Sequence, residues 1–311
     1  MVDNKQQWKA WLYLAPALIL LGIFTFYPLI NTFRIAFLEG YNGLAVLGGE
    51  SFTVGFDNFE RVLGYAGFMT CLKNTILLCV ITVPISTALA LLIAVTLNAI
   101  KPLQKLFQTI FFLPYITNSI AIGMVFNAMF SQVGTGDIIV TAGIINNIIG
   151  FFGIEPINWV NVGSSWGCNL FVTCVYIIWN ALPFKILVLL GGLQNINKQY
   201  YEAAKIDATP RSRVFWKITV PLLSPMLVYV IITSFIGGFK EYSSIVGIFG
   251  ETMGPPGNVS GGSMNTIVGY IYDCLPNSNT GLASAAALIL FAIILVVTAI
   301  NGYVSKKKVH Y

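Results

Sequence analysis

The amino-acid sequence predicts an all-α membrane protein that crosses the bilayer several times. Of its 311 residues, 56% are hydrophobic and only 9% are charged, whereas about a quarter of the residues in an average soluble domain are charged. Several apolar runs reach the roughly 20 residues that a helix needs to cross a bilayer. We therefore predict a single transmembrane domain with six spans, at about residues 11–38, 74–97, 109–131, 166–193, 222–249 and 281–304.

The first apolar run is predicted to be a span that is not cleaved. Lys5 and Lys9 precede it, but a signal peptide would have a shorter apolar core and a cleavage site of small residues. Trp8 and Trp11 suit the aromatic belt at the membrane surface. The run is therefore interpreted as part of the membrane domain.

The longer intervals between spans are predicted to be loops. Residues 39–70 are Gly-rich and acidic, and residues 250–279 are rich in Gly, Pro and Asn, with room for a short helix in the second interval. Between the third and fourth spans, an apolar stripe predicts a short amphipathic helix at the outer membrane interface. Its residues are Ile144, Ile145, Ile148, Ile149 and Phe152.

Basic residues gather in the intervals on one side of the predicted spans. They are Lys5, Lys9, Lys101, Lys105, Lys198, Lys205, Arg211, Arg213, Lys217, Lys306, Lys307 and Lys308. The opposite intervals contain mainly Arg61 and Lys73. Because cytoplasmic loops carry the excess of Lys and Arg, this distribution predicts that both termini and the interval at 200–221 are cytoplasmic.

The longest charged interval in the sequence lies at residues 200–225. Apolar residues at helical spacing predict a short helix in its first part. Thr209 is predicted to be the N-cap of a second short helix, because Pro210 suits the first helical position. That helix should end before Pro221. The pattern favours a helix–turn–helix hinge that docks on a partner.

The same interval resembles a known motif. Glu202-Ala203-Ala204, with Asp207 and then Ile218 and Pro221, is similar to the EAA loop of ABC-importer permeases. In that family the loop lies in the cytoplasm and fits a cleft on the ATPase subunit. The residues that the resemblance assigns to ATPase coupling are Glu202, Ala203, Ala204, Asp207, Ala208, Arg211 and Arg213.

One residue of the interval departs from the family pattern. Ala208 stands where the family usually has Gly. Glycine would ease a turn with positive φ, a conformation in which alanine is strained. Two alternatives follow for this chain: the turn is wider, or Ala208 stays helical.

The resemblance extends over almost the whole chain and is to sugar-type permeases, of the maltose-permease F or glycerol-3-phosphate-permease A kind. The phrases that carry it are Val54 to Phe59, Leu113 to Tyr115, Trp179 to Pro183, Phe239 to Tyr242, Thr252 to Pro256, Thr266 to Tyr272 and Gly281 to Ala285. It implies a permease subunit of the bacterial cell membrane that forms half of a translocation pathway for a sugar or oligosaccharide. A second permease, two ATPase subunits and an extracellular solute-binding protein would be its partners.

Polar groups inside the predicted spans indicate where that pathway runs, because such groups usually face a bundle interior or a cavity. Aromatic side chains beside amides and hydroxyls suit a sugar. The positions that match the family's transmembrane sugar site are Tyr115, Ser119, Asn180, Phe184, Gly238 and Glu241. Tyr115 and Ser119 are expected to share a helix face.

Structural roles remain open for these residues. Asn and Ser commonly join membrane helices to one another, and Lys240 and Glu241 would also fit as interfacial charges near the outer end of the fifth span. Adjacent residues in a helix point about 100° apart, so these two need not pair.

Several activities are not expected of this chain. The sequence has no Gly-x-x-x-x-Gly-Lys phosphate loop, so ATP and Mg²⁺ are expected on the partner ATPases and no cofactor on this chain. The five cysteines include no Cys-x-x-Cys pair, and His310 is the only histidine, which argues against a metal site. No catalytic residues are predicted.

Two other classes of protein are alternatives to an importer permease. An ion-coupled secondary transporter would act without an ATPase and often shows repeated halves, but no repeat is visible in the sequence. A membrane-embedded enzyme would need a titratable cluster in the bilayer, for which only Lys240 and Glu241 come close. The substrate stays open among sugars, polyols, sugar phosphates and uronate-bearing glycans, and Lys240 would favour an anionic group.

Overall fold

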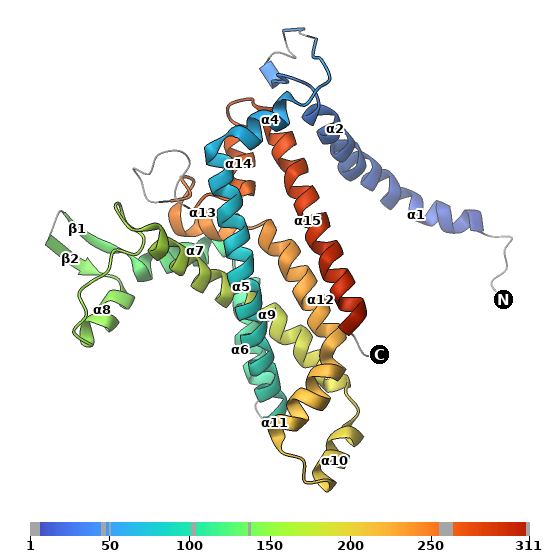
Figure 1. Ribbon diagram of the computed structural model, residues 1–311, viewed down its shortest axis with the longest axis vertical. Coiled ribbons are helices and arrows are strands. Elements are labelled where there is room, and N and C mark those ends of the chain that lie inside the picture. The colour runs from blue at the N-terminus through green and yellow to red at the C-terminus, as the bar shows by residue number, and fades with distance from the viewer. Residues whose placement is uncertain are drawn as a thin grey trace. The chain divides into compact units, whose positions relative to one another are not determined.

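The chain is mainly helical in the computed structural model, which describes residues 7–44, 48–49, 51–100, 104–135, 138–254 and 264–308 (Figure 1). Within these described residues, five helices are long and apolar enough to cross a membrane, or six if one bent pair counts as a single span. The predicted all-α membrane fold is therefore confirmed. Lys5, Lys101, His310 and residues 255–263 of the predicted loop lie outside the described residues.

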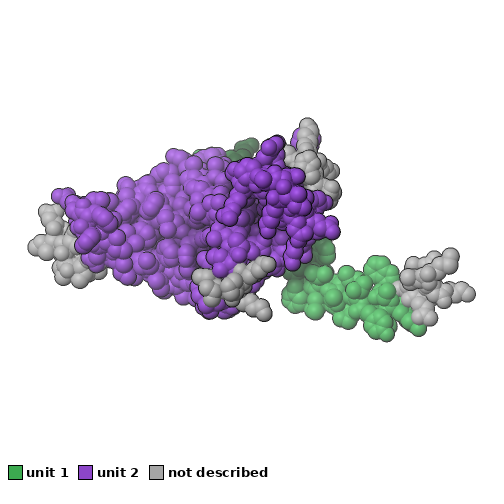
Figure 2. All heavy atoms as spheres, turned by 90° about the horizontal axis from the view of Figure 1, so that it is seen from below, with its two compact units in different colours: residues 1–66, 270–289 green, residues 67–269, 290–311 purple. Residues whose placement is uncertain are grey.

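The chain divides into two units, residues 1–66 with 270–289 and residues 67–269 with 290–311 (Figure 2). The first unit begins with α1 (Gln7–Leu21), the π-helical turn η2 (Gly22–Phe26) and α2 (Tyr27–Ala36). Together they form a continuous apolar run, Trp8–Ala36. The π turn directly precedes the Tyr27-Pro28 pair, and such a turn accommodates a proline that would clash with the carbonyl four residues earlier.

The predicted loop at 39–70 contains a short helix, α4 (Asp57–Gly64). Its buried Asn58 side chain donates from Nδ2 to the carbonyl oxygens of Ala36 (3.1 Å) and Leu38 (2.8 Å). Gly281 approaches this amide so closely that a Cβ there would lie 3.0 Å from Asn58 Nδ2. Asn58 therefore anchors the segment at 54–59 to the end of the first span by hydrogen bonds. Its side chain leaves no room for a larger residue at position 281.

The second unit is built on α5 (Ala66–Ala99), α6 (Gln104–Ile116), α9 (Trp166–Asn195) and α12 (Val220–Phe239). One apolar cluster joins α5, α9 and α12 through residues such as Ala90, Leu189 and Leu223. A second cluster joins α5 and α9 to α7 (Ser119–Phe130) and α13 (Ser243–Phe249). The last helix, α15 (Thr280–Lys308), begins in the first unit and ends in the second.

The second span is longer than the sequence predicted. It was expected at 74–97, but α5 begins at Ala66. Asn74 is fully buried in this helix, where its Nδ2 donates to the Asn265 carbonyl (3.0 Å) and its Oδ1 accepts from Trp166 Nε1 (3.1 Å). Thr75 Oγ1 accepts from the Ile267 amide (3.1 Å). These partners satisfy polar side chains in the first half of the helix, which extends eight residues before the predicted start.

The third span is broken. It was predicted as one span at 109–131 interrupted by Pro114, whereas α6 and α7 meet at an angle of 101°. Pro114 lies inside α6. The break follows Ile116, and Asn118 caps α7 by accepting from the Ile120 amide at 2.8 Å. An amide side chain that caps a helix start competes with helix continuation.

The fifth span is shorter than predicted at its C-terminal end. It was expected at 222–249, but α12 ends at Phe239 and α13 is a separate helix. In α13, Gly247 lies against Gly123 of α7, and a Cβ at Gly247 would lie 2.9 Å from Gly123 Cα. Small residues allow this close crossing of helices.

The interval between α7 and α9 holds a β-hairpin that the sequence did not predict. Strands β1 (Gln132–Thr135) and β2 (Ile138–Ala142) pair antiparallel, with an irregularity between Val133 and Gly134. The predicted amphipathic helix follows as α8 (Ile144–Phe151). Asn146 anchors it, donating from Nδ2 to the Ile157 carbonyl (3.0 Å) and accepting at Oδ1 from Trp159 Nε1 (3.0 Å).

The remaining interval, residues 264–279, contains α14 (Ile267–Cys274), the short helix for which the sequence left room.

Candidate functional site

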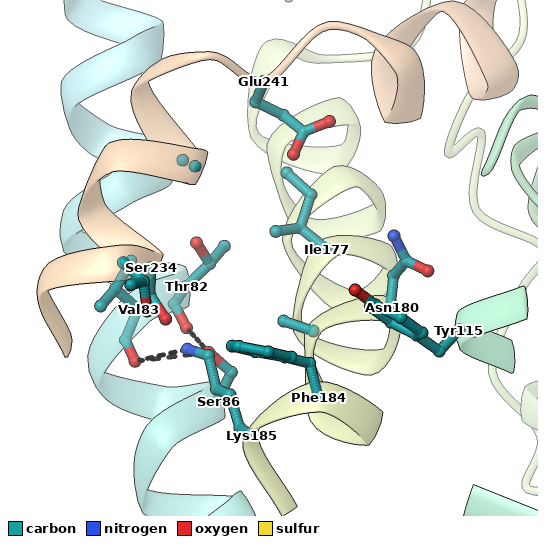
Figure 3. Close-up of a pocket in the computed structure, with 14 residues that line it drawn as sticks. Thr82, Val83, Ser86, Tyr115, Ile177, Asn180, Phe184, Lys185, Ser234 and Glu241 are labelled. Carbon is teal, nitrogen blue, oxygen red and sulfur yellow. Dashed lines mark hydrogen bonds between the residues drawn. The ribbon is translucent and has the colours of Figure 1, made fainter. Parts of the chain in front are cut away.

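A cavity of about 310 Å³ lies among α5, α6, α9 and α12 in the second unit (Figure 3). Five of the six predicted pathway residues line it: Tyr115, Asn180, Phe184, Gly238 and Glu241. Thr82, Ser86, Thr233 and Ser234 add hydroxyls to its wall. Aromatic, amide, hydroxyl and charged groups therefore converge on one space, as they do in sites that bind small polar molecules.

Two aromatic rings form one wall of the cavity. The rings of Tyr115 in α6 and Phe184 in α9 are stacked, with centroids 6.2 Å apart and planes at 20°. Asn180 lies one helical turn before Phe184 and beside Tyr115 in the close-up (Figure 3). An exposed ring face next to an amide can contact both the apolar face and the hydroxyl edge of a sugar ring.

Ser119 does not belong to this set. It was expected to share a helix face with Tyr115, but the break before α7 separates the two residues. The Ser119 carbonyl oxygen accepts a hydrogen bond from the Tyr176 hydroxyl at 2.6 Å. This residue therefore has a structural contact at the start of α7 and does not line the cavity.

Gly238 and Glu241 mark the end of α12. A Cβ at Gly238 would lie 2.9 Å from Cys79 Sγ, so a glycine lets α12 approach α5. Glu241 follows the helix and accepts from the Ser244 amide at 3.2 Å. Its neighbour Lys240 is exposed and does not line the cavity. The two adjacent charges thus lie in different surroundings, although both follow the end of α12 rather than lying within a helix as predicted.

Sequence reasoning missed a further charged residue, Lys185. It is only 3% exposed, and its Nζ donates to Ser86 Oγ (2.7 Å), to Thr87 Oγ1 (3.1 Å) and to the Val83 carbonyl (3.5 Å). Only Lys240 and Glu241 were predicted as ionisable groups in the bilayer, and that prediction was wrong. The signal was available, because a lysine inside an apolar span is rare and usually functional.

The predicted coupling interval forms two short helices at one end of the α5–α9–α12 bundle (Figure 1). The first is α10 (Lys198–Ile206), and the Asn197 side chain caps it by accepting from the Gln199 amide at 3.0 Å. Glu202 is exposed and Ala204 is buried. Ile206 at the end of the helix is 86% exposed, an unusual position for a large apolar side chain on a projecting segment.

The turn after α10 resolves the question posed by Ala208. Its φ is +48°, the left-handed conformation that glycine adopts readily. The Thr209 amide donates to the Ala204 carbonyl (2.9 Å) and the Ala208 amide to the Lys205 carbonyl (3.1 Å). This is the Schellman pattern of a helix end. Both sequence alternatives, a wider turn and a helical Ala208, are therefore wrong.

The second short helix also differs from the prediction. Pro210, not Thr209, is the N-cap residue of α11 (Arg211–Val214). The helix does not end before Pro221 but continues through the π turn η3 (Phe215–Thr219) into α12, giving one run, Arg211–Phe239. The Tyr201 hydroxyl and Thr219 Oγ1 lie 3.2 Å apart and join α10 to the π turn.

The charges of the coupling interval face solvent. Glu202, Asp207, Arg211 and Arg213 are all exposed. In the described part of the chain, none of these four side chains forms an ion pair. A cluster of exposed charges of both signs beside an exposed Ile206 suits a docking surface better than a folded core.

Among the described residues, no group of three or more His, Cys, Asp and Glu side chains is arranged to hold a metal ion.

Comparison with known proteins places this geometry in context. A family model described as "Binding-protein-dependent transport system inner membrane component" matches residues 86–310. The arabinooligosaccharides transport system permease protein AraP of Halalkalibacterium halodurans is 32% identical over 304 residues, 97% of this chain and 89% of that protein. The lactose transport system permease protein LacF of Rhizobium radiobacter is 31% identical over 296 residues, 94% of this chain and 91% of that protein.

A solved structure shares the fold. It is the crystal structure of a bacterial ABC transporter involved in the import of the acidic polysaccharide alginate, with a TM-score of 0.78 at 21% identity. The match covers 98% of this chain and 97% of that chain.

Proposed function

The chain belongs to the family of binding-protein-dependent transport system inner membrane components, and from that membership we propose that it is the permease subunit of an ATP-driven importer for a sugar or oligosaccharide. Its family makes it a multi-pass transport component of the bacterial plasma membrane rather than an enzyme, as the sequence predicted. The relatives named for arabinooligosaccharides and lactose support the substrate class.

The observation that carries the proposal is the connection between the coupling interval and the cavity. The α10–α11 interval joins the end of α9 to the start of the run that becomes α12. Both α9 and α12 line the cavity, through Asn180 and Phe184 on one side and Gly238 on the other. A force applied at the interval is therefore applied to two walls of the cavity at once.

The connection between the interval and the cavity wall is helical and continuous on the α12 side, so it can transmit that force. The helix runs without interruption from Arg211 to Phe239. The π turn lets this run pass Pro221, because its wider backbone accommodates a proline ring that would clash with the carbonyl four residues earlier. The Tyr201–Thr219 contact ties α10 to the same run. Displacement of α10 would thus move α12 as well.

We propose that a separate ATPase subunit binds the exposed face of this interval. Glu202, Asp207, Arg211 and Arg213 would make polar contacts with the ATPase, and Ile206 would insert its apolar side chain between them. ATP and Mg²⁺ would be bound by the ATPase, since this sequence has no phosphate loop. Closure of the ATPases would then drive the cavity between outward and inward openings.

The other partners follow from the same proposal. A solute-binding protein would deliver the sugar from outside, a second homologous permease would complete the pathway, and both termini with the α10–α11 interval would be cytoplasmic. The excess of basic residues in that interval supports the orientation. The stacked pair Tyr115 and Phe184, with Asn180 and Glu241, would contact the sugar in transit.

The proposal is tested by replacing Glu202. In Glu202→Lys, the charge of the coupling face is reversed at an exposed position, so the permease should still insert in the membrane. Co-purification of the ATPase subunits in mild detergent and ATP-dependent sugar uptake should both be lost. Glu155→Lys is the matched control, because Glu155 is also exposed but lies outside the interval.

Two outcomes would contradict the proposal. Normal uptake and ATPase co-purification in Glu202→Lys would exclude the coupling role. Sugar uptake by the purified chain without any ATPase would favour an ion-coupled secondary transporter instead.

A further inference from the structure

Lys185 places a positive charge at the wall of the cavity. It lies on α9 directly after Phe184, and both residues line the space. In Figure 3 its amino group points toward α5, where it meets Ser86 and the Val83 carbonyl. The side chain is 3% exposed, so the charge is held in the interior of the bundle.

The partners of this ammonium group are all neutral. They are two hydroxyls and one backbone carbonyl, and in the described part of the chain no carboxylate oxygen lies within 4.0 Å of Lys185 Nζ. A buried charge without a counter-charge is costly. Such a charge at the wall of a cavity is a candidate for pairing with a charged ligand.

The hydrogen bonds position the ammonium without using it fully. Ser86 Oγ donates to the Thr82 carbonyl and Thr87 Oγ1 to the Val83 carbonyl, so both hydroxyls present lone pairs to Lys185. The third contact, to the Val83 carbonyl, is 3.5 Å long and lies at the limit for a hydrogen bond. One N–H of the ammonium group is therefore weakly held.

The opposite end of the cavity has a different character. Glu241 approaches from the end of α12, while Asn180 and Tyr115 lie on the side wall (Figure 3). A carboxylate and an amide can accept hydrogen bonds from sugar hydroxyls, whereas the carboxylate repels a second acid. A ligand with hydroxyls at one end and an acidic group at the other would match this arrangement only with its acid beside Lys185.

We propose that the transported saccharide carries an acidic group, a carboxylate or a phosphate, and that Lys185 binds it in this cavity. The inference rests on the proposed function for the ligand being a saccharide, and it adds the ligand's charge. It also corrects the sequence expectation that Lys240 would favour an anionic group, because Lys240 is exposed away from the cavity lining. Ser86 and Thr87 act as positioning residues for the ammonium.

The test compares ligands that differ only in charge, with the detergent-purified permease complex and no solute-binding protein present. The probes are trigalacturonate and its carboxyl-reduced neutral counterpart, then glucose 6-phosphate and glucose, with inorganic phosphate as the free anion. Wild-type protein should bind at least one acidic probe about tenfold or more tightly than its neutral counterpart, as expected for a charge-assisted contact in the interior.

Variants separate ligand binding from structure. Lys185→Met removes the charge, leaves an unbranched side chain one atom shorter, and should abolish the preference for the acidic probe. Lys185→Arg keeps the charge and should retain a preference. Lys240→Met removes an exposed lysine and should bind as the wild type does.

Four results would overturn the inference. They are equal affinities of the wild type for acidic and neutral probes, no detectable binding of any acidic probe, an unchanged preference in Lys185→Met, and binding of inorganic phosphate as tight as that of glucose 6-phosphate. A lower thermal midpoint in Lys185→Met with unchanged binding would show a purely structural lysine. The Glu202→Lys experiment tests the importer itself, so loss of ATPase coupling there with no acid preference here would refute this inference alone.

Discussion

The cavity and the coupling interval use charge in opposite ways. At the cavity, Lys185 is buried and bonded to Ser86 and Thr87. In the coupling interval, Glu202 and Arg211 are exposed and belong to a group of charges that form no ion pair among the described residues. The buried charge of Lys185 therefore has a fixed environment of packed side chains. The exposed charges of the coupling interval are accessible to a binding partner.

This difference separates two kinds of dependence. The cavity is a tertiary feature, assembled from four helices that must pack closely. The coupling interval is a local feature, held by its own hydrogen bonds, such as the one from the Thr209 amide to the Ala204 carbonyl. Substitutions that add volume should therefore damage the first region, and substitutions that change backbone preference should affect the second.

The largest effect is expected where two helix backbones touch. Gly247→Ala puts a Cβ 2.9 Å from the Gly123 Cα and from the Ile120 carbonyl oxygen. Because these are backbone atoms, α7 and α13 must separate, at a cost of about 1–3 kcal/mol or more for overpacking. The thermal midpoint of the purified protein should fall clearly.

Gly191→Ala is the matched control for that substitution. Gly191 lies in α9, and a Cβ there meets no atom within 4 Å. Alanine is favoured over glycine in a helix by about 1 kcal/mol, so the midpoint should stay constant or rise. Equal losses in the two variants would show that the α7–α13 crossing is not close-packed.

The contrast between the two regions also explains what the sequence could predict. The α10–α11 interval was recognised because its motif is contiguous. The left-handed conformation of Ala208 was not predicted, although the glycine that the family has at this position favours it. The local hydrogen bonds that fix it involve residues only a few positions apart.

The cavity was predicted less completely, because its geometry depends on contacts between distant residues. Ser119 was assigned to it from the family resemblance and was expected to share a helix face with Tyr115, but a new helix begins at Ser119, capped by Asn118. Lys185 was overlooked as part of the cavity. Its partners Ser86 and Thr87 lie 99 and 98 residues away in the sequence, so no local pattern connects them to it. No periodicity in the sequence relates positions on two different helices.

An intermediate effect is expected from the aromatic wall. Phe184→Leu keeps an apolar side chain but removes the ring stacked on Tyr115. Aromatic contacts of this kind contribute about 0.5–1.5 kcal/mol beyond area burial, so the KM for sugar uptake should rise up to about tenfold with ATPase co-purification unchanged. Phe171→Leu is the control on the same helix, since Phe171 does not line the cavity. An equal rise in KM in both variants would show that the aromatic wall is not part of the sugar pathway.

The smallest effect is expected at Ala208, and its sign is informative. Alanine in the left-handed conformation is disfavoured by about 1–2 kcal/mol, while glycine loses about 0.5–1 kcal/mol more entropy on ordering. Ala208→Gly should therefore stabilise the interval by a few tenths to about 1 kcal/mol. Ala203→Gly, in the exposed middle of α10, should destabilise it by about 1 kcal/mol.

Limited proteolysis of the interval in the purified protein measures both changes. Protection should rise in Ala208→Gly and fall in Ala203→Gly, although the two variants make the same chemical change five residues apart. Because the first variant restores the residue that the family usually has, ATPase co-purification should be retained in it. A fall in protection in both variants would mean that residue 208 is helical in the purified protein, and the interval would then lack the left-handed turn that ends α10.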